Sequence, residues 1–296
     1  MRILPRPFGQ VLNDALGSLL RTWRPLASTA IMVFLPVGAA TLLVFELSGA
    51  TDFLEAVLSE PSSFRTLPND VLLELARPFI LATTIALALQ GLATLYVYLV
   101  CHRLTALDIK GEPWNARIER RNALRRYGRA LVSSLIVLTA VSALIALGAL
   151  AWGIPAAMVG TPNSTSAVIA ASLLVALLAP GVWLGISQSM LTSVLSLEEL
   201  GITRSLRRSH ALVKGRWWAT FGFLAMIGLL GSVAIQLIQI VAIPMAAVGG
   251  VGFGLILVSL LGLAAQGPIV AAMGAAYTHW YVDLRSRREP FMRDQL

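Results

Sequence analysis

The sequence predicts an all-α fold, a polytopic integral membrane helical bundle of about six transmembrane helices, because charge is scarce and is excluded from two long tracts. Of the 296 residues, 57% are hydrophobic and 13% are charged, whereas a soluble domain has about 25% charged residues. No Asp, Glu, Lys or Arg occurs in the 68 residues 130–197 or in the 66 residues 217–282. Since about 20 apolar residues cross a bilayer core of ~30 Å, each tract is expected to cross twice.

Turn-forming residues divide the two tracts. The first divides at residues 160–164 (Gly-Thr-Pro-Asn-Ser) and the second near Gly249 and Gly250. Two further apolar runs precede them. The six predicted spans are residues 26–45, 78–101, 131–158, 167–195, 218–247 and 253–281. They form a single membrane domain, residues 1–296, with hairpin units of approximately 1–110, 111–200 and 201–296.

Basic residues gather in alternate connections. Of the 23 Lys and Arg residues, 21 lie before the first span or after the second, fourth and sixth spans. The connection 49–77 has only Arg65 and Arg77, with five acidic residues. The positive-inside rule therefore predicts a multi-pass protein of the bacterial plasma (inner) membrane with both termini in the cytoplasm. A cleavable signal is not expected, because the first long apolar run begins only near Leu26.

Three segments on the predicted cytoplasmic side have the pattern of interfacial amphipathic helices. In residues 8–23, apolar residues recur at i, i+3, i+4 and i+7, and Ser18 and Arg21 fall on the opposite, polar side. Residues 118–131 and 202–217 show the pattern less regularly. Each segment precedes the first span of a hairpin, so each is expected to lie in the interface and turn into that span.

The second span of each hairpin contains a helix-weakening group near its middle and is followed by an acidic residue. The groups are Gln90-Gly91, Pro180-Gly181 and Gln266-Gly267-Pro268, and the acids are Asp108, Glu198 and Asp283. The spacings from glycine to acid are 17, 17 and 16 residues. This regularity indicates a threefold parallel repeat, unlike the inverted repeats of many transporters. The alternative is that any hairpins containing Gly and Pro align this well.

The segment after the fourth predicted span carries the most specific motif. Residues 197–218 read LEELGITRSLRRSHALVKGRWW. The segment resembles the signature of the membrane domain attached to some bacterial glycerophosphoryl diester phosphodiesterases, which also occurs as a stand-alone protein. That family has an acidic residue, a Gly, a stretch like Ala-Leu-Arg-Arg-Ser-Trp, then Leu-x-Lys-Gly and aromatic residues. Ser205 and His210 depart from its usual Ala and Trp.

The resemblance implies a membrane module without catalysis. In full-length relatives a separate barrel of roughly 250 residues hydrolyses the diester, and this chain has no room for one. The His-Arg-Gly start of that barrel is also unmatched, because Leu104 follows His102 and Arg103.

Basic residues of the interfacial segments are the candidates for binding lipid head groups. Guanidinium groups bind phosphate bidentately, and anionic membrane surfaces attract basic segments. The candidates are Arg120, Arg121, Arg125, Arg126, Arg207, Arg208 and Lys214. The alternative is that these charges only fix topology. The expected partner is anionic phospholipid rather than nucleic acid, with a protein partner left open.

Glutamines within apolar runs are the candidates for an intramembrane polar cavity. They are Gln90, Gln188, Gln236, Gln239 and Gln266. Since a lipid-facing amide is costly, they are expected to point into the bundle. The alternative is hydrogen bonding between helices, worth about 0.6 to 2 kcal/mol per contact.

The sequence indicates neither a catalytic site nor a metal or cofactor site. His102, His210 and His279 lie in separate segments, Cys101 is the single cysteine, and no G-x-S-x-G elbow occurs. The preferred interpretation is a non-enzymatic protein that binds or organises lipids or serves a partner as its membrane module. A transporter or permease-like subunit for a lipid or small solute is the alternative. A membrane-embedded enzyme is a third reading, and it requires His or acidic residues to converge in space.

Overall fold

The computed structural model describes residues 4–59, 61–64, 67–159, 178–249 and 251–289, and in this part of the chain the secondary structure is helical, with no strand. The helices are α1 (Phe8–Ser48), α2 (Ala50–Ser59), α3 (Pro61–Phe64), α4 (Asn69–Lys110), α5 (Ala116–Val159), α7 (Leu191–Leu197), α8 (Ile202–Val213), α9 (Trp217–Gly249) and α10 (Val251–Arg288). Residues 178–187 are also helical. The predicted all-α helical bundle is therefore confirmed.

Five helical segments in the described chain are long and apolar enough to cross a membrane. They are Phe8–Ser48, Asp70–Lys110, Ala116–Ala146, Leu178–Leu197 and Trp217–Leu237. The protein is thus a multi-pass membrane protein by the length and composition of its helices. The count of six spans and the threefold repeat stay predictions.

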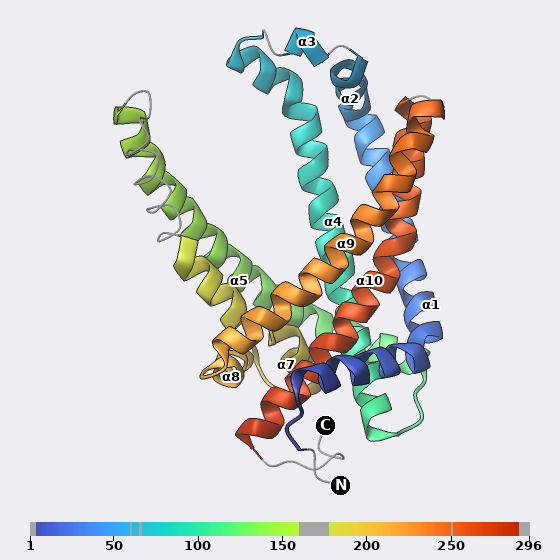
Figure 1. Ribbon diagram of the computed structural model, residues 1–296, viewed down its shortest axis with the longest axis vertical. Coiled ribbons are helices and arrows are strands. Elements are labelled where there is room, and N and C mark those ends of the chain that lie inside the picture. Colours follow the sequence, from blue (N-terminus) through green and yellow to red (C-terminus); the bar gives the residue numbers. More distant parts are fainter. Residues whose placement is uncertain (1–3, 60, 65–66, 160–177, 250, 290–296) are drawn as a thin grey trace.

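Helix α1 joins the first interfacial segment to the first span without a break. Figure 1 shows that the first part of α1 lies across one end of the bundle and that the rest rises through it. Pro25 lies between these two parts, and a proline inside a helix removes a hydrogen bond and kinks the axis. Gly49, with φ 75°, ends the helix in a left-handed conformation that suits glycine.

The other interfacial segments differ in how they meet their spans. Helix α5 continues through both, whereas α8 ends before Gly215, whose φ of 82° turns the chain into α9. The predicted division near Gly249 agrees with the end of α9. The predicted turn at 160–164 and the first part of the fourth span lie outside the described residues. The described remainder of that span is interrupted by a turn at 188–190.

Close contact between helices depends on two glycines of α10. A Cβ at Gly267 would lie 2.8 Å from the Ala30 Cβ of α1, and one at Gly274 would lie 2.7 Å from the Cys101 Cβ of α4. Small residues let membrane helices approach closely in this way. Gly267, predicted to weaken its helix, therefore also permits α10 to pack against α1.

The described core lies where α1, α4, α7, α8, α9 and α10 meet, and the first part of α5 packs against it. Its largest fully buried side chains include Tyr281, Phe34, Phe223, Leu26 and Leu99. Figure 1 shows α5 diverging from α4 with distance from this region, while α9 and α10 approach each other.

Candidate functional site at the arginine-rich end

One end of the bundle collects the basic segments. Figure 1 places the beginning of α1, the end of α10, α8 and the connection between α4 and α5 there, and α2 and α3 at the opposite end. We call it the arginine-rich end. The predicted separation of basic and acidic connections is therefore present in the fold.

A buried polar cluster joins α1, α4 and α10 at this end. The Ser18 hydroxyl donates to Asp108 Oδ2 at 2.6 Å and lies 2.9 Å from His279 Nε2. Arg21 binds the same carboxylate through Nε at 2.9 Å and Nη2 at 2.8 Å. The side chains of Ser18 and Asp108 come from the first hairpin, and His279 comes from the last predicted span. The cluster fastens the interfacial part of α1 to the bundle.

The direction of these hydrogen bonds does not suit nucleophilic catalysis. The bidentate contact with Arg21 favours an ionised Asp108, which accepts the single proton of Ser18. His279 Nε2 must then donate to Ser18 Oγ, so it cannot act as the base that removes the Ser18 proton. A catalytic triad places histidine between serine and the acid, whereas Ser18 lies between His279 and Asp108 here. Histidine and acid thus converge, as an enzyme would require, but in an arrangement suited to holding α1.

The two other acids of the predicted repeat have comparable partners. Glu198 accepts from Arg208 Nε at 3.1 Å and from the Tyr281 hydroxyl at 2.6 Å. Asp283, with a fully buried side chain, accepts from the Arg6 backbone N–H at 2.8 Å and from Arg287 Nε at 2.7 Å. Each acid that follows a second span therefore binds a basic or amide group that fixes a neighbouring segment.

His102 joins three helices at the centre of this end. Its Nδ1 lies 2.8 Å from Thr278 Oγ1, and its Nε2 lies 3.2 Å from Thr192 Oγ1. Since Thr278 gives its proton to the Gly274 carbonyl at 2.8 Å, Nδ1 donates to Thr278 and Nε2 accepts from Thr192. The imidazole is fully buried and both nitrogens have partners, which makes it a packing residue between α4, α7 and α10. Among the described residues, no group of three His, Cys, Asp or Glu side chains could hold a metal ion.

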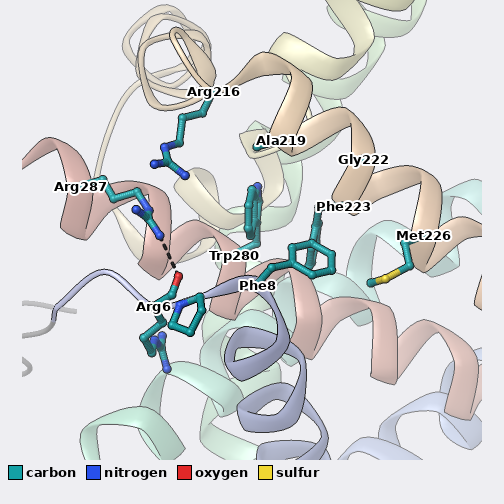
Figure 2. A pocket seen from close by; sticks show the side chains of 10 residues that line it. Arg6, Phe8, Arg216, Ala219, Gly222, Phe223, Met226, Trp280 and Arg287 are labelled. Atoms are coloured by element: carbon teal, nitrogen blue, oxygen red, sulfur yellow. Dashed lines mark hydrogen bonds between the residues drawn. The ribbon is translucent and has the colours of Figure 1, made fainter.

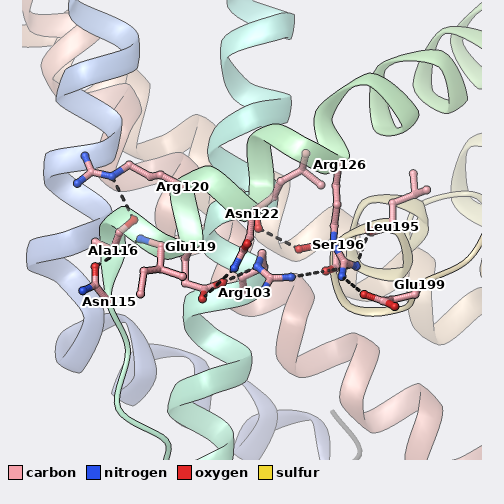
Figure 3. Close-up of polar contacts among 12 residues, drawn as sticks. Arg103, Asn115, Ala116, Glu119, Arg120, Asn122, Arg126, Leu195, Ser196 and Glu199 are labelled. Carbon is pink, nitrogen blue, oxygen red and sulfur yellow. Dashed lines mark hydrogen bonds and ion pairs between the residues drawn. The ribbon is translucent and has the colours of Figure 1, made fainter.

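Arg126, one of the predicted head-group residues, instead binds the end of α7. Its Nη1 donates to the Ser196 carbonyl at 3.0 Å, and its Nη2 lies 2.9 Å from Glu199 Oε1. Arg103 reaches the same carbonyl at 3.3 Å and pairs with Glu119 at 2.5 Å (Figure 3). Cations suit a helix carboxyl end because its last carbonyls have no partner within the helix. Arg126 thus stabilises the junction of α4, α5 and α7.

The other predicted head-group residues divide into held and exposed groups. Arg208 is held by Glu198 and Glu289. Arg120 donates to the Ala116 carbonyl at 3.2 Å within its own helix. The exposed residues are Arg121, Arg125, Arg207 and Lys214. Lipid binding by any of these residues stays a prediction.

The predicted glutamine cavity is not assembled by the described residues. Gln266 Nε2 donates to Gln90 Oε1 at 2.7 Å, which joins α10 to α4. Gln188 lies in the turn after residues 178–187, and its Oε1 is buried without a partner in the described chain. Gln236 is exposed on α9, so the expectation that it points into the bundle is wrong, because α9 turns that face outward. The Gln239 side chain lies outside the description.

A pocket of about 580 Å³ opens between α1, α9 and α10. Figure 2 shows the guanidinium groups of Arg216 and Arg287 on one side of the Trp280 ring and the rings of Phe223 and Phe8 on its other side. Trp280 and Phe223 stack with ring centroids 4.7 Å apart, and Phe8 meets Phe223 edge to face at 5.9 Å. We call it the α1–α9–α10 pocket. It combines cations with an aromatic floor, a combination found where membrane proteins meet head groups.

Sequence reasoning missed several residues of this end. The pattern of residues 8–23 predicts Ser18 on the polar side of an amphipathic helix, and the positive-inside rule accounts for Arg6, Arg216 and Arg287 by topology alone. The sequence does hold one signal for the pocket: Trp217, Trp218 and Phe221 follow Arg216, which places aromatic rings next to a cation. The convergence of Arg6 with Arg287 had no local signal, because the two residues lie 281 positions apart.

Comparison of the chain with known protein families, with curated proteins and with solved structures yields no match.

Proposed function

We propose that the chain is a non-enzymatic protein of the bacterial inner membrane, with both termini in the cytoplasm, that binds or organises lipids. One observation supports this proposal: exposed cations at the arginine-rich end lack a carboxylate within salt-bridge distance among the described residues. These cations include Arg117, Arg121, Arg125, Arg204, Arg207, Lys214 and Arg216. By contrast, Asp108, Glu198 and Asp283 each have a basic partner, and Gln90 and Gln266 hydrogen-bond to each other. Each basic residue near an anionic leaflet contributes about 1 kcal/mol of attraction.

Lipid analysis of the purified chain tests this function. The chain is extracted in mild detergent, and its bound lipids are compared with the lipids of the source membrane. We expect enrichment of anionic phospholipid, reduced in the double variant Arg121→Gln and Arg125→Gln, whose side chains are exposed. Arg126 is left intact because its loss would disturb the α7 junction. Bound lipid with the composition of the bulk membrane would reject the proposal.

We also propose that the chain belongs to the glycerophosphoryl diester phosphodiesterase membrane-domain family. The support is that two residues of the motif have clear structural roles in this fold. Glu198 binds Arg208, and Gly215 adopts the positive φ of 82° with which the chain turns from α8 into α9. In this reading the chain serves a partner as its membrane module. Affinity capture from native membranes, read by protein mass spectrometry, tests for that partner.

A transporter or permease-like subunit for a lipid or small solute is the second candidate, and the observation that favours it is the polar contact between Gln90 of α4 and Gln266 of α10 within apolar helices. In this candidate a polar path opens where these two side chains meet. A disulfide linking these two positions, in a Gln90→Cys and Gln266→Cys variant, would block transport of a fluorescent lipid in proteoliposomes. An unchanged rate of movement after oxidation would reject this candidate.

A further inference from the structure

The α1–α9–α10 pocket carries positive charge that the acidic residues of the described chain do not fully neutralise. Arg216 is exposed and has no carboxylate partner in the described chain, and no acidic residue lines the pocket. Arg287 and Arg6 do have acidic partners, Asp283 and Asp14 respectively. However, Nε and Nη2 of Arg6 are buried without an acceptor among the described residues. The pocket therefore has more donors than the surrounding residues satisfy.

Helix ends add to this positive character. Helix α1 begins at Phe8, in the pocket wall, with no side-chain cap and no acidic residue in its first turn. Helix α9 begins at Trp217, and its first turn is also free of acids. The amino ends of helices favour anions because their first N–H groups are unpaired and the helix dipole is positive there. Together with Arg216 and Arg287, these ends make the pocket suited to a phosphate group.

An apolar groove continues from the pocket toward the middle of the bundle. Its volume is about 280 Å³, and the same three helices line it through Leu12, Leu16, Ile227, Leu230, Ala234 and Ile269. Phe223 and Met226 line the pocket, and Ile227 and Leu230, four residues further along, line the groove, so the two cavities follow successive turns of one face of α9. From Ile227 to Ala234 the helix advances about 10 Å, which fits within one leaflet of a ~30 Å core.

We infer that the α1–α9–α10 pocket and its apolar groove bind one anionic phospholipid. The phosphate lies between Arg216 and Arg287, the glycerol region lies against Phe8, Phe223 and Trp280, and an acyl chain occupies the groove. Guanidinium groups match phosphate oxygens in charge and in geometry, and the groove offers the chain a hydrocarbon surface. This inference rests on the proposed lipid-binding function and names its ligand class and its site.

Two matched pairs of variants test the site. Arg216→Gln removes the pocket's unpaired cation, and Arg77→Gln removes an exposed cation of α4, outside the arginine-rich end, with the same change in net charge. Ala234→Trp fills the groove, and Val233→Trp places the same bulk on an exposed position, 48% accessible, next to it. The full chain is titrated with phosphatidylglycerol and with phosphatidylcholine of the same acyl chains, and bound lipid is counted by native mass spectrometry. Inorganic phosphate is titrated as a control.

We expect Arg216→Gln to lower the preference for phosphatidylglycerol about fivefold, the effect of one cation worth ~1 kcal/mol, and Ala234→Trp to lower the binding of both lipids. The control variants should bind as the unaltered chain does. If the unaltered chain prefers phosphatidylglycerol and Arg216→Gln retains that preference, lipid binding stands and this site is overturned. If the unaltered chain shows no preference, the proposed function and this site both fall. Displacement of phosphatidylglycerol by inorganic phosphate would overturn the assignment to lipid.

Discussion

Ser18 illustrates how a polar residue of a membrane helix can face inward. Its hydroxyl is fully buried against Asp108 and His279, while Leu16 and Leu20 on the same helix are 58% and 73% accessible. In a soluble protein the leucines would face the core. In a bilayer the exposed leucines meet lipid, and the polar groups find partners inside the protein.

Replacing Ser18 with alanine should destabilise the protein by about 1–3 kcal/mol, because the change removes the bridging hydroxyl between Asp108 and His279. Thermal unfolding in detergent measures the effect. Ser28→Ala is the control, since among the described residues Ser28 donates only to the Pro25 carbonyl of its own helix. Equal melting temperatures for the two variants would show that the cluster does not stabilise α1.

Glu289 provides a pH-dependent contact between α8 and the end of α10. Burial alone would raise its pKa, but hydrogen bonds from Arg208 and Arg285 outweigh burial and hold the pKa below the usual range of a glutamate. A lowered pKa in the folded state means that the contact stabilises the protein above pH ~4.3. The stabilisation is lost as the pH falls through the lower folded-state value.

The variant Glu289→Gln should therefore melt at a lower temperature than the unaltered chain at pH 7. The difference should shrink as the pH falls below ~4.3 and through the lower pKa of the folded state, since the glutamate then becomes protonated. Melting curves in detergent at pH 7 and over a series of acidic pH values measure it. A difference that persists at low pH would assign the stabilisation to packing rather than to charge.

At the scale of helices, glycine sets the distances between α10 and its neighbours. Gly274→Ala should destabilise the bundle, because the new Cβ would lie 2.7 Å from Cys101 Cβ and α10 would have to move away from α4. Gly262→Ala, at an open position of the same helix, should be neutral or stabilising by up to about 1 kcal/mol. Unfolding in detergent compares them, and a stabilising Gly274→Ala would contradict the close approach.

The helices were more predictable than the contacts between them. Absence of charge over 130–197 and 217–282 fixes where lipid-crossing helices can run, and the end of α9 at Gly249 follows from the glycines there. The partners of Arg126 could not be predicted, because its target is a backbone carbonyl 70 residues away. Gln90 and Gln266, 176 residues apart, could be recognised as polar but not as a pair. The prediction that Gln236 points into the bundle failed for a different reason. In a helix that is apolar all round, no periodic pattern of polar residues shows which face lies outward.

At the scale of the whole molecule, the charge asymmetry becomes a test of orientation. Ser62→Cys in α3 and Thr203→Cys in α8 place reactive thiols at exposed positions of opposite ends, and the native Cys101 is buried. A membrane-impermeant maleimide added outside intact cells should label Ser62→Cys and spare Thr203→Cys, because the arginine-rich end is expected to face the cytoplasm. Labelling of both after permeabilisation is the control. The reverse pattern would invert the predicted topology.

The contact of Asp283 with the Arg6 backbone and of His279 with Ser18 has a consequence for biogenesis. Arg6 and the first part of α1 emerge from the ribosome before α4 and α10, and two of the groups that hold them, His279 and Asp283, are translated more than two hundred residues later. Until α10 inserts, only the contacts of this cluster with Asp108 of α4 can form. Insertion of α10 thus completes the attachment of α1, and quality-control proteases would reach the earlier intermediate at α1.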